Sequence, residues 1–129
     1  MSESQHSASQ YKDIITTCQS LFEKKTQDYG TAWRILRLPS ITDQIFIKAK
    51  RIRTIQELGK QKINDDINSE FQGIINYCIM ALIQINLLED QRIDIPLEEL
   101  SSLYTQEVKQ SLELFMQKNH DYGEAWRDM

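Results

Sequence analysis

The chain has 129 residues, 40% of them hydrophobic, which is enough for one domain with a modest core. Its 15 Lys and Arg residues against 19 Asp and Glu residues give a net charge of -4. This balance disfavours nucleic acid and anionic membranes as partners, because both require a cationic surface. We expect no secretory signal and no membrane partner, and therefore a cytoplasmic protein, because no apolar run approaches ~18 residues.

Polar, serine-rich sequence fills residues 1–9, where we expect a disordered tail. Apolar residues then recur at three- and four-residue steps, which predicts a first helix that runs to about Gln27. Gly30 should end this region in a left-handed conformation. The stripe of the predicted helix consists of Tyr11, Ile14, Ile15, Cys18, Leu21 and Phe22.

Leu38-Pro39 interrupts the helical pattern, because proline disfavours helical geometry in the residue before it. Ser40 or Thr42 is predicted to cap a second helix, and Gly59 is predicted to end it. Its expected buried seam comprises Ile41, Ile45, Ile52, Ile55 and Leu58.

A third helix should begin near Asn64 or Asp65 and be the most buried, because its apolar residues cover most of its circumference. Pro96 should start a fourth helix. No strand-like alternation occurs, so the fold class is all-α, most simply a helical bundle. Cys18 and Cys78 lie on apolar stripes without a nearby Cys or His, which favours two buried thiols.

The phrase Asp-Tyr-Gly-x-Ala-Trp-Arg occurs twice, at 28–34 and at 121–127. A shift of 93 residues also superposes Tyr11 on Tyr104 and Phe22 on Phe115. This predicts a first helical repeat over 10–92 and the start of a second, incomplete repeat over 97–129. Because the second unit lacks partner helices, we expect either a missing C-terminal second repeat or a homo-oligomer that completes it.

The charged residues of the repeated phrase leave two interpretations open. Gly30 and Trp33 are typical of a packed turn, whereas Lys25, Asp28 and Arg34 also suit a polar, planar, phosphorylated ligand. A structural latch and a ligand site therefore remain alternatives. The same alternatives, phosphate binding or a solvated helix face, hold for Lys48 and Arg51 on the second helix.

Residues 25–34 (KTQDYGTAWR), 48–52 (KAKRI) and Asn76-Tyr77 resemble nucleotide modification associated domain 1. The resemblance covers about residues 11–90, and 104–129 again as the start of a second copy. Its members occur in phage and bacterial settings linked to modified nucleotides. It implies that the substrate-binding residues are Lys25, Asp28, Tyr29, Trp33, Arg34, Lys48 and Arg51, with Lys118, Asp121, Tyr122, Trp126 and Arg127 in the second copy.

The helical order is also similar to that of the MazG-like all-α nucleoside triphosphate pyrophosphohydrolases, which hold Mg²⁺ with Glu-x-x-Glu and Glu-x-x-Asp pairs. Here the third helix keeps only Glu70 of such a pair, and the second helix is basic at 48–51. Mg²⁺ as a cofactor would then require Asp28, Asp66 and Glu70. Alternatively, the acids of the third helix are the ordinary acidic bias of a helix start.

Two hypotheses for function result. The first is a nucleotide-binding helical protein, with a Mg²⁺-dependent pyrophosphohydrolase-like activity linked to nucleotide modification or clean-up. The second is a non-catalytic helical oligomerisation or scaffold module with a degenerate metal site. No phosphate-binding glycine loop, nucleophile motif or zinc motif separates them.

Overall fold

The computed structural model describes residues 3–59 and 64–122. Over these residues the chain forms helices and no strand, which confirms the all-α prediction. None of the described helices is both long enough and apolar enough to span a membrane. The elements are α1 (Glu3–Tyr29), the short 3-10 helix η1 (Ala32–Ile35), α2 (Leu38–Leu58), α3 (Asn64–Asn86) and α4 (Leu97–Tyr122).

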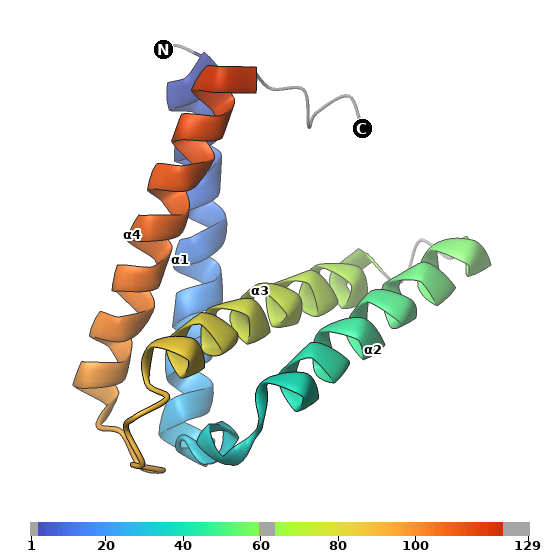
Figure 1. The fold of residues 1–129 in the computed structure, drawn as a ribbon. Helices are drawn as coiled ribbons and strands as arrows, with labels where there is room; N and C mark the ends of the chain where they lie inside the picture. The colour runs from blue at the N-terminus through green and yellow to red at the C-terminus, as the bar shows by residue number, and fades with distance from the viewer. Residues whose placement is uncertain (1–2, 60–63, 123–129) are drawn as a thin grey trace.

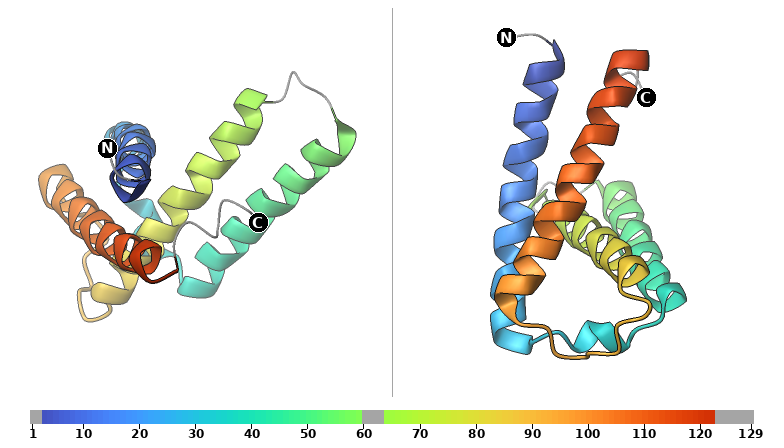
Figure 2. Two further views of the ribbon diagram at one scale, coloured as in Figure 1. Left: turned by 90° about the horizontal axis from the view of Figure 1, so that it is seen from above. Right: turned by 60° about the vertical axis from the view of Figure 1, so that its left-hand side comes forward.

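Two antiparallel helix pairs are joined at an angle (Figure 1). Helices α1 and α4 lie side by side, whereas α2 and α3 form a hairpin that projects from one half of the α1–α4 pair (Figure 2). Helix α3 contacts both α1 and α4, and α2 packs on α3. The other half of the α1–α4 pair rises beyond the hairpin (Figure 1).

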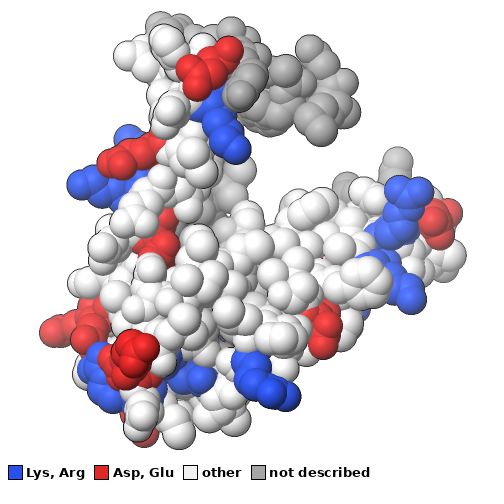
Figure 3. Space-filling model, in the orientation of Figure 1, with Lys and Arg blue, Asp and Glu red and all other residues white. Residues whose placement is uncertain are grey.

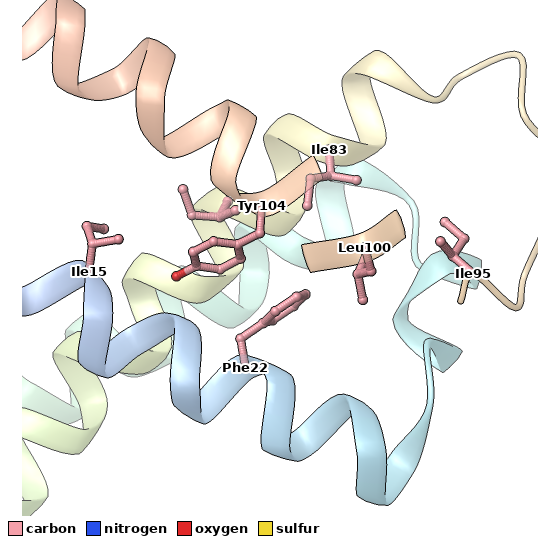
Figure 4. Close-up of a cluster of buried hydrophobic side chains, with 7 residues drawn as sticks. Ile15, Phe22, Ile83, Ile95, Leu100 and Tyr104 are labelled. Atoms are coloured by element: carbon pink, nitrogen blue, oxygen red, sulfur yellow. The ribbon is translucent and has the colours of Figure 1, made fainter. Parts of the chain in front are cut away.

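The hydrophobic core lies where α3 crosses the α1–α4 pair (Figure 4). Phe22 of α1 and Tyr104 of α4 meet at its centre, with ring centroids 4.9 Å apart. Aromatic rings at this separation contribute about 0.5 to 1.5 kcal/mol beyond the burial of their area. The other buried members of the cluster are Ile15, Ile79, Ile83, Ile95 and Leu100.

Glycine ends two helical segments as the sequence predicts. Gly30 has φ 70° and Gly59 has φ 63°, a left-handed conformation that other residues adopt at a cost. The predicted cap of α2 at Ser40 or Thr42 is wrong, because the helix already begins at Leu38 and Pro39 occupies its first turn. Proline is tolerated there because the first backbone N–H groups of a helix have no intrahelical acceptor.

Three further expectations need correction. Helix α1 begins at Glu3, within the predicted disordered tail at 1–9, and Ser7 is already buried. Helix α3 is not buried on all sides, since Phe71 is exposed and Cys78 is exposed while Cys18 is fully buried. Leu58, predicted to belong to the buried seam of α2, is exposed. The packing of α4 on α1 explains the early start of α1, and the exposed residues of α3 lie on a face that the described helices do not cover.

Candidate functional site

The first copy of the repeated phrase forms the turn between α1 and η1. The Gly30 N–H donates to the Thr26 carbonyl at 2.7 Å, and the chain then enters η1, which carries Trp33. The Thr31 hydroxyl donates to the Ile93 carbonyl at 2.5 Å and accepts from the Ile95 N–H at 3.2 Å. The turn is therefore fastened to the segment that precedes α4.

Arg34 joins the turn to the end of α3 and to the segment that follows α3. Its guanidinium donates to the Arg92 carbonyl at 3.0 Å, to the Asp90 carbonyl at 2.7 Å and to the side chain of Gln84. The Gln84 amide in turn donates to the carbonyls of Arg34 and Leu36, each at 3.0 Å. These contacts favour the latch interpretation of Arg34, because its donors already have protein acceptors.

A pocket opens between the end of α1, the turn and the α2–α3 hairpin. We call it the turn pocket. Tyr29, Trp33 and Tyr77 supply aromatic rings, and Lys25 and Lys48 supply cations from two different helices. The complete lining comprises Leu21, Phe22, Lys25, Thr26, Tyr29, Gly30, Trp33, Lys48, Ser69, Gly73, Asn76, Tyr77 and Met80.

Lys48 lies across α3, where a glycine leaves space for it. A Cβ atom at Gly73 would stand 2.9 Å from Lys48 Cε, which is too close for an unshifted side chain. The ammonium group lies 5.9 Å from the centroid of the Tyr77 ring, in cation–π range. Gly73 therefore determines the course of Lys48 along the wall of the turn pocket.

Glu70 pairs with both cations of the basic segment of α2. Its carboxylate lies 3.4 Å from Lys48 Nζ and 2.9 Å from the Arg51 guanidinium. Burial alone would raise the pKa of Glu70, but the hydrogen bond from Arg51 and the charge of Lys48 outweigh burial and lower it. Glu70 is therefore an anion whose two oxygens face protein cations.

Asn76 anchors the inner wall of the turn pocket to the core. Its amide donates to the Cys18 carbonyl at 3.1 Å, and its carbonyl accepts from the Tyr104 hydroxyl at 2.7 Å. Burial raises the pKa of Tyr104 well above its usual value, so this hydroxyl is a donor at neutral pH. By contrast, the buried indole N–H of Trp33 has no acceptor among the described residues.

The predicted binding residues fall into three groups. Lys25, Tyr29, Trp33 and Lys48 line the turn pocket, whereas Asp28, Arg34 and Arg51 are not part of its lining. Lys118 and Asp121 lie near the end of α4 and are not part of this lining. The predictions for Trp126 and Arg127, and for the side chains of Tyr122 and Asp66, lie outside what the structure describes.

A magnesium site does not fit the described carboxylates. Glu70 is engaged by Lys48 and Arg51, and Asp28 is exposed outside the turn pocket. Among the side chains that the structure describes, which do not include Asp66, no three of His, Cys, Asp or Glu are grouped so that they would hold a metal ion. Mg²⁺ prefers several oxygen ligands in near-octahedral geometry. No metal-dependent step is therefore derived from these residues.

Sequence reasoning missed Gln84 and Ser69. Gln84 stands in an otherwise apolar stretch of α3, and a buried polar side chain in such a stretch requires partners. That signal marks Gln84 as important but does not identify the turn as its partner. Ser69 carries no comparable signal, and only the packing of α2 on α3 brings it to the pocket.

Residues 25–85 match the family described as nucleotide modification associated domain 1. This confirms the resemblance over a segment that contains every lining residue of the turn pocket except Leu21 and Phe22. No curated protein and no solved structure matches the chain. The similarity of residues 104–129 to the same family, and of the fold to MazG-like enzymes, stays a prediction.

Proposed function

We propose that this nucleotide modification associated domain binds a nucleotide in the turn pocket. The observation that carries the proposal is the convergence of two lysines and four aromatic rings, from α1, η1, α2 and α3, on one pocket. Aromatic faces stack on bases, and lysine ammonium groups neutralise phosphate oxygens. The turn pocket therefore has groups suited to the base of a nucleotide and groups suited to its phosphates.

The polar groups of the turn pocket suit a ligand rich in hydrogen-bond acceptors. Lys25 and Lys48 are hydrogen-bond donors only. No Asp or Glu belongs to the lining. Phosphate oxygens and the carbonyl and ring-nitrogen acceptors of a base match this set.

The size of the turn pocket limits how much of the nucleotide it encloses. Its cavity volume is about 180 Å³. Pockets that enclose a whole drug-sized ligand measure roughly 300 to 1,000 Å³. The pocket thus takes one part of the nucleotide, with the remainder lying along the exposed rim that Tyr29 and Lys25 form.

The proposal concerns binding and contains no metal-dependent hydrolysis. Phosphate would replace Glu70 as the partner of Lys48, and Glu70 would keep its contact with Arg51. This exchange leaves no carboxylate unpaired, which keeps its cost low. Binding should therefore not require Mg²⁺ and should persist in the presence of a chelator.

Thermal unfolding against nucleoside mono-, di- and triphosphates, with and without Mg²⁺, tests the proposal. A ligand at 100 times its Kd adds about 2.7 kcal/mol to the folded state, which raises the Tm by several degrees. Lys25→Met and Lys48→Met should each weaken binding about tenfold or more. Matched controls are Lys24→Met and Lys50→Met, which change exposed lysines outside the pocket lining. A folded protein that no nucleotide stabilises would contradict the proposal.

A further inference from the structure

The α1–α4 pair has an internal twofold relationship, but the described hairpin packs on one half of the pair. Tyr11 stacks on Phe115 with ring centroids 5.3 Å apart, and Phe22 meets Tyr104 at 4.9 Å. The shift of 93 residues exchanges these two contacts, because it carries Tyr11 to Tyr104 and Phe22 to Phe115. The same antiparallel contact is therefore built twice, once in each half of the pair.

Among the described residues, a hairpin covers one of these two halves. In the covered half Phe22 and Tyr104 are buried, and Asn76 of α3 bridges Tyr104 and Cys18. The shift carries these two bridged residues to Tyr11 and Ser111, whose side chains lie close to each other. We call the half that contains Tyr11, Ser111 and Phe115 the open half; its side chains are partly exposed.

An apolar groove lies where the twofold relationship would place a second α3. An antiparallel helix pair repeats about an axis perpendicular to both helices, so both hairpins would lie on the same face of the α1–α4 pair. The groove is on that face, beside α3, in the largely uncharged notch between the two helix pairs (Figure 3). Its walls include Tyr11, Ile14, Ile74, Cys78, Leu82 and Ser111.

The groove is continuous with the hydrophobic core. Ile15 and Ile79 belong to the buried cluster and also line the groove. Ile14 is 53% exposed and Leu82 is 37% exposed, although both are apolar and face this extension of the core. Contiguous exposed apolar surface of this kind is typical of an interaction site.

We propose that the groove is the docking site of a second helical hairpin with the sequence pattern of α2–α3. The inner helix of this hairpin would carry an amide at the position of Asn76 and branched aliphatic residues three and seven positions later. The amide would bond to Tyr11, and the aliphatic residues would pack on Phe115. A second folded copy of this chain does not suit the groove, because its Asn76, Ile79 and Ile83 are already buried against its own α1 and α4.

Docking would also build a second pocket. The second hairpin would bring its counterpart of Lys48 beside Lys118, which occupies the position of Lys25 in the repeat. The first pocket would not change, because the covered half keeps its own hairpin. The inference therefore does not depend on nucleotide binding.

An extended chain tests the docking proposal directly. Met129 falls at the position of Leu36 in the repeat, so a second copy of residues 37–95 is joined after Met129 in phase. The appended cysteine is replaced by serine, which leaves Cys78 in the groove and the buried Cys18 as an internal control. The rate at which a thiol reagent labels Cys78 is then compared in the 129-residue protein and in the extended chain.

Cys78 should react about tenfold more slowly, or slower still, in the extended chain, a factor that corresponds to 1.4 kcal/mol of docking free energy. The control extension carries aspartate at its counterparts of Ile79 and Ile83, and should leave the rate unchanged. A Leu82→Asp substitution in the groove of the extended chain should likewise return the labelling rate of Cys78 to that of the 129-residue protein, without unfolding the first hairpin. Equal Cys78 rates in both extensions would overturn the proposal. A dimer of the 129-residue protein that already protects Cys78 would also overturn it.

Discussion

The two halves of the α1–α4 pair present the same ring contact in different surroundings. Phe22 is 2% exposed, whereas Phe115 is only partly buried, because α3 covers the first half alone. Only the covered half carries the Asn76 bridge and a described pocket lined by both lysines and aromatic rings. The repeated helix is common to both halves, and the α2–α3 hairpin adds the turn pocket to one of them.

The largest expected difference between the halves comes from removing a ring. Phe22→Ala should lower the free energy of unfolding by about 3 to 5 kcal/mol, because it leaves a cavity in the core. Phe115→Ala should cost no more than about 2 kcal/mol, because its ring gives up less buried area. Urea unfolding of the two variants measures the difference. Equal losses would contradict the distinction between a covered and an open half.

The latch of the turn gives the next largest effect. Arg34→Met should lower the free energy of unfolding by about 1 to 3 kcal/mol, because it removes charge-assisted hydrogen bonds to the carbonyls of Asp90 and Arg92. Nucleotide affinity, measured by titration calorimetry on the folded variant, should stay within about twofold of the parent, the scatter usual for such effects. A selective loss of affinity with unchanged stability would favour the ligand interpretation of Arg34.

Removal of one hydroxyl from each half sharpens the comparison further. Tyr104→Phe should cost about 1 to 2 kcal/mol, because it leaves the buried carbonyl of Asn76 without its donor. Tyr11→Phe should cost less, because its partner Ser111 is partly exposed and has access to water. Chemical denaturation at pH 7 gives both values. A larger loss from Tyr11→Phe would reverse the assignment of the halves.

Tyr104 makes the free energy of unfolding depend on pH under alkaline conditions. The pKa of Tyr104 is raised in the folded state by burial, so the unfolded chain loses this proton first. Its contribution is complete below the unfolded value of 10.0 and is lost as pH rises above that value. The free energy of unfolding, measured by denaturation between about pH 8 and pH 11, where tyrosine titrates, should fall less steeply with pH for Tyr104→Phe than for the parent.

The smallest expected effect on stability comes from Gly73→Ala. Alanine is favoured over glycine in a helix by about 1 kcal/mol, so the free energy of unfolding should stay constant or rise slightly. The new methyl group would displace Lys48 from its path across α3. We therefore expect weaker nucleotide binding in a protein of undiminished stability, measured by calorimetry and urea unfolding together. Unchanged affinity would show that the course of Lys48 is unimportant for the site.

The sequence predicts some features of the fold and of the turn pocket well and misses others. Periodicity locates the helices, and the two glycines mark where helical segments end, because these are local properties of the chain. The repeated phrase contains Tyr29 and Trp33, and Lys25 stands three residues before it; all three line the turn pocket. Asp28 and Arg34 belong to the same phrase yet lie outside that lining, because successive residues of a turn point in different directions.

What the sequence determines by itself is the all-α class, the two helical segments that end at glycine and the repetition of one sequence pattern. These follow from backbone preferences and the spacing of apolar residues, which act within a few turns of helix. The tertiary structure alone decides that Lys48 meets Glu70, that Arg34 donates to the Asp90 carbonyl and that Cys78 is exposed. Each of these depends on how α3 crosses the α1–α4 pair, and packing between distant segments sets that crossing.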